Sequence, residues 1–221
     1  MTSQTRGLLA GILLAAVPAV AALVARKTEK PWIPQAPDYR HAGAPDAPAV
    51  LVEFGDFQCP PCGYAAPIVK KMESDYGEKL HVVFKHRPWL EMHKWAKASA
   101  LAAECAGKQG KFWPMYDLLF SKQAEWSRPP QAAGNSAERE DTRDVPKILE
   151  GYAQSMGLDM KAYRQCVADP ATFALIEADV KDAQDHFINS TPTFFVDGRR
   201  LVGGNQLKVL GANEIERRLG R

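Results

Sequence analysis

The stretch that most constrains the fold of this chain is residues 50–67, VLVEFGDFQCPPCGYAAP, in which two cysteines separate two hydrophobic patterns. The apolar, β-branched run at 50–54 predicts a buried strand. After the cysteines, apolar side chains recur at every fourth position, which predicts a helix. Cys59 and Cys62 are therefore expected between the end of a strand and the start of a helix. Pro60 and Pro61 fit this place because the first helical positions need no N–H donor.

A Cys-x-x-Cys pair at the N-terminus of a helix is typical of thiol redox chemistry. The unpaired N–H groups and the positive end of the helix dipole stabilise a thiolate there. The pKa of a cysteine so placed falls from about 8.5 to between ~3.5 and ~7.5. We therefore expect Cys59, at the cap, to be the reactive thiol. Cys62, one turn further into the helix, is expected to be the shielded resolving thiol.

Half of a zinc site and an inert structural disulfide are two other interpretations of this pair. Zinc would need two further ligands at matching spacing. Cys105 and Cys166 are single cysteines, and the sequence has no second Cys-x-x-Cys and no His-x-x-x-His. His86 and His93 have no partner at metal spacing and are interpreted as ordinary surface or strand-end residues. We therefore favour redox chemistry and predict no metal and no cofactor.

Residues 7–25, GLLAGILLAAVPAVAALVA, carry no charge and are followed by two basic residues. At ~1.5 Å per residue the run covers about 28 Å, close to the ~30 Å hydrocarbon core of a bilayer. Its length favours an uncleaved membrane anchor, whereas Arg6 and the small residues at 19–21 favour a cleavable signal peptide. In either case residues 1–25 direct the remainder to the periplasm or cell envelope, anchored to the cytoplasmic membrane or cleaved and soluble.

Export also changes the interpretation of Cys105 and Cys166, because two cysteines can persist as a disulfide in an oxidising compartment. Both lie in segments with helical patterns, at 98–110 and 160–169. A structural bridge between two helices is therefore one prediction. The alternative is a pair of buried free thiols that behave as small hydrophobic side chains.

The remaining segments predict an α/β fold with an all-helical insertion. Residues 26–46 are rich in proline and alanine, lack periodicity and are interpreted as a semi-extended linker. A second strand is predicted at 79–86, and the polar segment 121–144 is interpreted as a surface loop or excursion. Helical patterns cover 93–107, 110–120, 145–156, 159–167 and 170–187. They are followed by a strand at 193–196, a two-residue turn, a return strand at 200–202 and an amphipathic helix at 207–219.

This order of elements resembles the DsbA-like class of exported thiol–disulfide oxidoreductases, which have a thioredoxin fold with an inserted helical domain. The resemblance covers about residues 47–220 and includes Cys59-Pro60-Pro61-Cys62, with Pro67 eight residues after the first cysteine. It implies a thioredoxin-fold domain and an inserted helical domain, at 47–90 with 188–221 and at 91–187.

The resemblance also implies roles for residues outside the Cys-x-x-Cys motif. Glu53, six residues before Cys59, matches the buried acid beneath the disulfide, which implies a proton-transfer partner for Cys62. A lone carboxylate among apolar residues on a central strand is costly unless it has a function. Thr191 and Pro192, just before the last hairpin, match the cis-proline loop that lies against the active-site disulfide.

The implied reaction is dithiol–disulfide exchange, in which a substrate thiolate attacks Cys59 of the Cys59–Cys62 disulfide and the substrate's second thiol resolves the mixed disulfide. The implied partners are cysteine-containing exported proteins and a membrane redox partner that resets the site, with membrane contact through residues 7–25. The net charge of +2 gives no electrostatic case for nucleic acid. Phe57 and Trp89 are interpreted either as core aromatics or as an apolar docking surface.

The direction of the reaction is the point at which this chain departs from the pattern. DsbA itself has histidine at the second intervening position, where this chain has Pro61. A histidine there donates a hydrogen bond to the Cys59 thiolate and favours the reduced form. Proline has no donor and cannot do so, and thioredoxin, a reductant, has proline at this position. The first expectation is an enzyme that introduces disulfides. The alternatives are a reductase or isomerase, for example in cytochrome maturation, and a non-catalytic, chaperone-like binding module.

Overall fold

The computed structural model describes residues 32–127 and 143–221, and Ile33–Arg221 form one compact unit. The membrane anchor or signal peptide expected at 1–25 lies outside the described ranges and stays a prediction. Within those ranges, no helix combines the length and the apolar character needed to cross a membrane.

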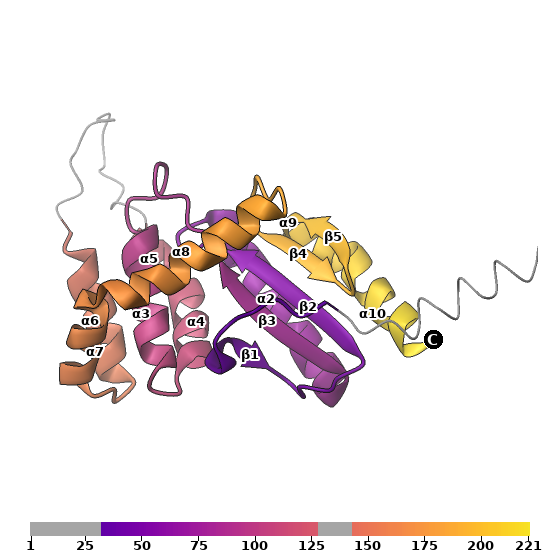
Figure 1. The fold of residues 1–221 in the computed structure, drawn as a ribbon, viewed down its shortest axis with the longest axis horizontal. Coiled ribbons are helices and arrows are strands. Elements are labelled where there is room, and N and C mark those ends of the chain that lie inside the picture. Colours follow the sequence, from indigo (N-terminus) through magenta and orange to yellow (C-terminus); the bar gives the residue numbers. More distant parts are fainter. Residues whose placement is uncertain (1–31, 128–142) are drawn as a thin grey trace, which may run out of the picture. The chain divides into compact units, whose positions relative to one another are not determined.

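A five-stranded sheet forms the centre of this unit, with strand order β1-β3-β2-β4-β5 (Figure 1). The strands are β1 (His41–Ala42), β2 (Ala49–Gly55), β3 (Leu80–His86), β4 (Thr193–Val196) and β5 (Arg199–Val202). β2 and β3 are parallel and therefore need a crossover, which includes α2 (Pro60–Tyr76). The other neighbouring pairs are antiparallel. Every residue of β2 and β3 is buried, which explains the apolar run at 50–54.

Most of the described helices lie between β3 and β4 in the sequence. They are α3 (Ala96–Gly107), α4 (Phe112–Ser121), α5 (Gln123–Ser127), α6 (Val145–Ser155), α7 (Met160–Ala168) and α8 (Pro170–Asp185). In Figure 1, α3 to α7 gather beside the sheet and α8 runs back from them towards β4. The predicted α/β fold with an all-helical insertion is confirmed.

The C-terminal helix begins earlier than the expected 207–219 and is interrupted. It consists of α9 (Gly203–Gln206), a π-helical segment (Leu207–Gly211) and α10 (Ala212–Leu219). A periodicity of 3.6 residues does not distinguish a π turn within a continuous helix from a regular one.

Short polar residues and prolines set where three helices of the insertion begin. Asp144, Asp159 and Asp169 each accept hydrogen bonds from backbone N–H groups of the following turn, as N-cap residues do. Pro146 and Pro170 occupy early helical positions, where no N–H is needed. The starts of α6, α7 and α8 consequently agree with the sequence patterns to within one residue.

A tight turn joins β4 to β5 and is fixed to β2. Asp197 and Gly198 both have positive φ, 47° and 82°, as a two-residue hairpin turn of this kind requires. Asp197 N donates to Val50 O, and Val50 N donates to Asp197 Oδ1. These bonds place the last hairpin beside the strand that leads to Cys59.

The linker predicted at 26–46 is wrong for much of its described part. Asp38–Arg40 form a 3-10 helix, and the strand after them pairs with β3. Arg40 is fully buried because its guanidinium meets two buried carboxylates, those of Glu104 and Asp179. Hydrophobic periodicity does not reveal a segment that is held by ion pairs and by one short strand.

The surface loop predicted at 121–144 is wrong in its first residues, which form α5. Trp126 is fully buried and donates through Nε1 to Leu119 O at 2.8 Å, and Gln123 is also buried. A five-residue helix is too short to show a period of 3.6 residues in the sequence. Residues 128–142 lie outside the described ranges.

Two of the hydrophobic clusters that stabilise the fold border the cysteine motif or its helix. One is formed by α2, the sheet and the C-terminal helices, and includes Leu51, Val69, Phe194 and Ile215. The other lies among the inserted helices and one end of the sheet, and includes Phe84, Tyr116, Trp126, Cys59 and Cys62. In this second cluster Cys105 forms a disulfide with Cys166 that joins α3 to α7. The two cysteines of the motif thus lie where the sheet meets the inserted helices.

Candidate thiol redox site

Cys59 and Cys62 lie at the N-terminus of α2. Cys59 is the N-cap residue, Pro60 begins the helix, and the backbone N–H groups of Cys62 and Gly63 both donate to Cys59 O. Cys59 is 6% exposed and Cys62 is 0% exposed, and both are free thiols. The site therefore has an outer sulfur that a partner can approach and an inner sulfur that is shielded.

The two thiols differ in acidity. A hydrogen bond from Cys62, helped by the Thr191 side chain, outweighs burial and lowers the pKa of Cys59 to about 6. Burial raises the pKa of Cys62 well above its ordinary value, and its hydrogen bond to Cys59 adds to this. At neutral pH the outer sulfur is therefore a thiolate and the inner one a thiol, as a nucleophile and a resolving thiol require.

The loop of Thr191 and Pro192 lies against Cys59. The peptide bond between these two residues is cis, and in its thiol form Cys59 Sγ donates to Thr191 O at 3.4 Å. Trp89 Nε1 donates to Thr191 Oγ1 at 3.0 Å, so the segment after β3 holds the loop from another side. Gly203 N donates to Pro192 O at 2.8 Å. The fold thus brings this loop to a cysteine 132 residues earlier in the chain.

Glu53 lies within β2 and is completely buried. Its Oε2 accepts a hydrogen bond from Tyr116 at 2.8 Å, and Oε1 has no hydrogen-bond partner within residues 32–127 and 143–221. Burial raises the pKa of Glu53 to about 8, although the bond from Tyr116 lowers it. The Glu53 charge also contributes to the raised pKa of Cys62. A protonated carboxyl is therefore available on the inner side of the site at neutral pH.

The structure adds a second buried carboxylate that sequence reasoning missed. Asp56 is 2% exposed, and its Oδ2 accepts from Trp89 N at 2.9 Å and lies 2.6 Å from His93 Nδ1. Its Oδ1 accepts from Gln58 N at 2.8 Å. Asp56 carries the same signal as Glu53, a lone carboxylate in an apolar stretch. His93 carries no such signal because it lies 37 residues further along the chain in an irregular segment.

Two glutamines fix the backbone around Cys59. Gln123 Nε2 donates to Phe57 O at 2.8 Å and to Cys59 O at 2.9 Å. Gln58 Oε1 accepts from Trp95 N at 2.6 Å, and its Nε2 donates to a backbone carbonyl at the end of α5. The inserted helices therefore hold the cysteine loop directly. No local sequence signal distinguishes these glutamines from surface residues.

The interpretation of His86 as a strand-end residue is confirmed, but both His86 and His93 have specific carboxylate partners. His86 ends β3, but it is 1% exposed and its Nε2 lies 3.0 Å from Glu104 Oε1. His93 is bonded to Asp56 within the redox site. Both histidines find their partners through the fold rather than through spacing in the sequence.

The two aromatic residues considered for a docking surface have different positions. Phe57 is 1% exposed and stacks on Phe84 with ring centroids 5.2 Å apart, so it belongs to the core. Trp89 is partly exposed beside Thr191, and the Arg87 guanidinium lies 4.0 Å from the centre of its ring. Only Trp89 of the two lies at the surface of the site.

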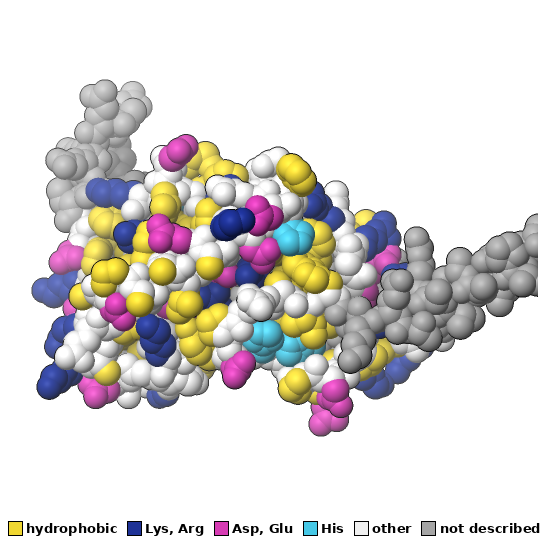
Figure 2. Space-filling model, viewed as in Figure 1, with side chains coloured by type: hydrophobic (Ala, Val, Ile, Leu, Met, Phe, Trp, Pro, Cys, Tyr) yellow, Lys and Arg dark blue, Asp and Glu magenta, His cyan; other side chains and the backbone are white. Residues whose placement is uncertain are grey.

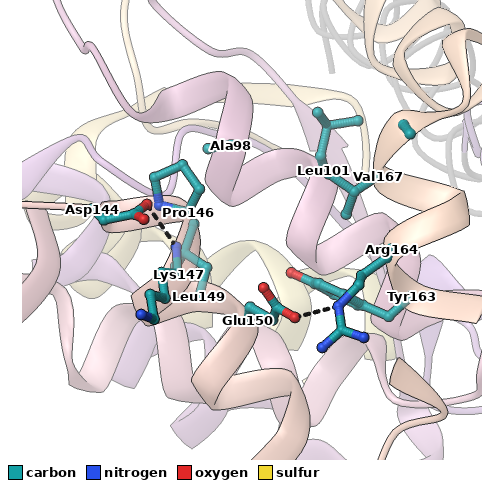
Figure 3. Close-up of a pocket in the computed structure, with 11 residues that line it drawn as sticks. Ala98, Leu101, Asp144, Pro146, Lys147, Leu149, Glu150, Tyr163, Arg164 and Val167 are labelled. Carbon is teal, nitrogen blue, oxygen red and sulfur yellow. Dashed lines mark hydrogen bonds and ion pairs between the residues drawn. The ribbon is translucent and has the colours of Figure 1, made fainter. Parts of the chain in front are cut away.

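The cavity drawn in Figure 3 is separate from this site. It has a volume of about 450 Å³ and is lined mainly by residues of α3, α6 and α7, among them Ala98, Leu101 and Val167. Glu150 and Arg164 form an ion pair there. None of the predicted site residues lines it. No cysteine lines it either, so this cavity has no direct part in thiol exchange.

Charged side chains of both signs are spread over the surface. On the face drawn in Figure 2, acidic and basic side chains are interspersed with apolar ones. In the part of the chain that the structure describes, no three His, Cys, Asp or Glu side chains are grouped so that they could hold a metal ion.

A family model described as thioredoxin matches residues 35–212. Solved structures with a similar fold include a thioredoxin-like oxidoreductase from Silicibacter pomeroyi, alpha-DsbA1 from Wolbachia pipientis and oxidised BdbD from Bacillus subtilis. Their TM-scores are 0.63, 0.66 and 0.62, at 22%, 21% and 24% identity. The matches cover 82%, 84% and 80% of this chain and 92%, 93% and 92% of those chains. The expected thioredoxin fold with an inserted helical domain is confirmed.

Curated relatives match the chain at higher identity. The Na(+)/H(+) antiporter NhaA 1 of Salinispora arenicola is 37% identical over 181 residues, which are 81% of this chain and 25% of that protein. The Na(+)/H(+) antiporter NhaA of Herminiimonas arsenicoxydans is 33% identical over 180 residues, which are 81% of this chain and 26% of that protein. The chain thus spans about a quarter of the length of these relatives.

Proposed function

The chain belongs to the thioredoxin family and has the fold of its DsbA-type members, and from this premise we propose that it is an exported thiol–disulfide oxidoreductase that introduces disulfides into envelope or secreted proteins. The observation that supports this most directly is the placement of Cys59. It is an outer thiol at a helix N-cap, its pKa is lowered to about 6, and it lies against the Thr191-Pro192 loop above the buried Cys62.

The reaction begins with Cys59 and Cys62 joined as a disulfide. A substrate thiolate attacks Cys59 Sγ, a bond forms between the two sulfurs, and the Cys59–Cys62 bond breaks with its electron pair on Cys62. The second substrate thiolate then attacks the substrate sulfur of the mixed disulfide, and Cys59 leaves as a thiolate. The substrate dithiol is oxidised to a disulfide and the enzyme disulfide is reduced. The low pKa of Cys59 makes it a good leaving group in the last step.

Glu53 is proposed as the proton donor to Cys62 in the first step. The leaving Cys62 sulfur is completely buried, and a thiolate there is unfavourable. Glu53 is protonated at neutral pH because burial raises its pKa to about 8, and it influences the Cys62 thiol electrostatically. Its proton neutralises the new thiolate without requiring water to enter the core.

The substrates proposed are exported proteins with free cysteine pairs. Pro192 and Thr191 border the outer sulfur, so an extended substrate segment can pair with the backbone of this loop. A membrane redox partner would return Cys59 and Cys62 to the disulfide. The apolar residues 7–25 support a location in the periplasm or cell envelope, with the chain anchored in the cytoplasmic membrane or cleaved from its signal.

The direction of the reaction is tested by equilibrating the full chain with glutathione and reading the redox state of Cys59 and Cys62 separately from that of Cys105 and Cys166. We expect a reduction potential near −120 mV, which is that of a disulfide donor. A value near −270 mV would assign the chain to the alternative, a reductase or isomerase fed with electrons. Pro61, which has no donor, is the feature that supports this alternative.

The role of the cysteines is tested in a cell-envelope folding assay. Cys59→Ser should abolish activity, and Cys62→Ser should accumulate a mixed disulfide between Cys59 and substrates, because the resolving thiol is missing. The double variant Cys59→Ser with Cys62→Ser is the control that traps nothing. Full activity of Cys59→Ser would instead support a non-catalytic, chaperone-like binding module.

A second candidate function draws on the curated relatives, which are named as Na(+)/H(+) antiporters and of which the chain matches about a quarter. In it, the chain exchanges disulfides with a Na(+)/H(+) antiporter of the same membrane, rather than with soluble exported proteins. The same Cys62→Ser trap separates the two candidates. Mass spectrometry of the trapped species should find soluble exported proteins for the first and a transporter for the second.

A further inference from the structure

The carboxylate of Asp56 lies buried in the redox site, where its negative charge disfavours the thiolate form of Cys59. Asp56 is 2% exposed and precedes Cys59 by three residues. Its negative charge acts to raise the pKa of Cys59 and therefore disfavours the thiolate. A buried carboxylate is tolerated when a positive charge and hydrogen bonds compensate it.

His93 supplies that compensation. Its Nδ1 lies 2.6 Å from Asp56 Oδ2, and its side chain is 18% exposed. The other hydrogen bonds to Asp56 come from the neutral backbone N–H groups of Gln58 and Trp89. Among the described residues, His93 is thus the cationic side chain that bonds directly to Asp56.

The pair adjoins Cys59, whose backbone N–H donates to Asp56 O at 3.1 Å, and is electrostatically linked to it. The hydrogen bond to Asp56 raises the pKa of His93 against the effect of partial burial, and the charge of Cys59 raises it as well. Such an interaction is reciprocal: a thiolate that favours the imidazolium is itself favoured by the imidazolium through the same free energy. Protonated His93 therefore offsets the effect that Asp56 has on Cys59.

The other cations of the same segment have different contacts. The Arg87 guanidinium lies over the Trp89 ring, 4.0 Å from its centre, and interacts electrostatically with Asp56. The Lys94 ammonium lies 4.6 Å from the centre of the Trp95 ring. Arginine stays charged throughout the accessible pH range.

The remaining titratable groups near the site act on the inner sulfur. Glu53 influences Cys62, which lies beneath Cys59. The two residues between the cysteines, Pro60 and Pro61, have neither a charge nor an N–H donor. A positive charge beside the outer sulfur must therefore come from outside the motif.

We propose that His93, held by Asp56, is a positioning residue whose positive charge compensates that of Asp56 and so favours the Cys59 thiolate. The proposal rests on the proposed function, because it concerns the reactivity of the same sulfur. A residue between β3 and α3 would then help to stabilise the Cys59 thiolate, although no local sequence pattern connects this segment with the cysteines.

The test is the pH dependence of alkylation of Cys59 by iodoacetamide in the reduced full chain, with the modified residue identified by mass spectrometry. His93→Gln should raise the midpoint of the alkylation profile by roughly one pH unit and slow alkylation about tenfold below the midpoint. His93→Lys restores a cation and should return most of the shift. Asp56→Asn combined with His93→Gln should lower the midpoint again, because the uncompensated carboxylate is then gone.

Lys94→Gln is the matched control, since it removes a positive charge from the neighbouring residue in the sequence and should leave the midpoint unchanged. A purely structural role of His93 would lower the melting temperature of His93→Gln and leave its midpoint in place, which would contradict the proposal. A wild-type midpoint near the ordinary value of about 8.5 would contradict both this proposal and the proposed function. A low wild-type midpoint that His93→Gln does not move would contradict the role of His93 alone.

Discussion

Glu53 and Glu104 are two glutamates without any exposed surface, and they have opposite pKa shifts. Glu53 has one hydrogen bond, from Tyr116, and burial raises its pKa to about 8. For Glu104 burial acts in the same direction, but hydrogen bonds and charges from His86 and Arg40 outweigh it and lower the pKa to about 2. One carboxyl is therefore neutral at pH 7 and the other is ionised.

The two carboxyl groups are equally buried but differ in the side chains that contact them. Glu104 receives two hydrogen bonds of 2.7 Å from Arg40 and one of 2.8 Å from Tyr39, and it lies 3.0 Å from His86 Nε2. That site ties the N-terminal segment to the inserted helices. Within residues 32–127 and 143–221, Glu53 forms no ion pair, and its raised pKa keeps it protonated at neutral pH. A buried glutamate is thus an ion that stabilises the fold in one region and a neutral acid in the other.

The largest expected effect is on stability and comes from breaking the structural site. Arg40→Met should lower the free energy of unfolding by about 3–5 kcal/mol, because it leaves the charges of Glu104 and Asp179 buried with too few partners. Urea denaturation at pH 7 measures this change. A loss below about 1 kcal/mol would show that His86 and Lys85 compensate these carboxylates without Arg40.

The second expected effect is a gain in stability at high pH, in contrast to the loss expected for Arg40→Met. Glu53 is ionised above pH 4.5 in the unfolded chain but only above about pH 8 in the folded one, so wild-type stability falls as pH rises between these values. Glu53→Gln should remove this fall and be more stable than the wild type at pH 8, by up to about 4 kcal/mol. Urea midpoints at pH 4.5 and pH 8 for both proteins give the comparison. An equal fall in the two proteins would mean that another group causes it.

A smaller effect follows from changing the one hydrogen bond of Glu53. Tyr116→Phe keeps the ring in the core and removes the donor, so the pKa of Glu53 should rise further, by an amount that corresponds to about 1 kcal/mol. Infrared titration of the protonated carboxyl band measures that pKa. A fall in the pKa would show that water replaces the tyrosine hydroxyl.

The smallest effect is expected at an exposed ion pair. Lys70 and Asp117 form a salt bridge with side chains 62% and 44% exposed. Lys70→Met should change the free energy of unfolding by less than about 0.5 kcal/mol, because exposed pairs are weak. This variant is the matched control for Arg40→Met, since both replace a paired cation by methionine. A loss as large as that of Arg40→Met would remove burial as the explanation of the difference.

The residues around the cysteines could be predicted because their signals are local. An apolar run, two prolines and a cap position placed Cys59 and Cys62 at a strand–helix junction, and the resemblance to a family, supported by the cost of a lone acid on an apolar strand, indicated Glu53. Thr191 and Pro192 are 132 and more residues away, so only the resemblance to a family brought them into the site.

The partners of the remaining site residues could not be predicted because they meet only in the folded chain. Asp56 and His93 are 37 residues apart, and Arg40 and Glu104 are 64 apart. Ion pairs have no period in a sequence, and a buried arginine in a proline-rich segment looks like part of a linker. Electrostatics requires that a buried charge has a partner, but it does not indicate which residue of the chain will be that partner.

The disulfide between Cys105 and Cys166 encloses a long stretch of the chain, with a sequence separation of 61. A protease that cuts once anywhere between these two cysteines leaves two fragments that remain covalently joined. The nicked protein should migrate as a single species on a non-reducing gel and as two fragments after reduction. The protein would thus survive a single cut between these two cysteines as one molecule, with the sheet and α2 still linked to all the inserted helices.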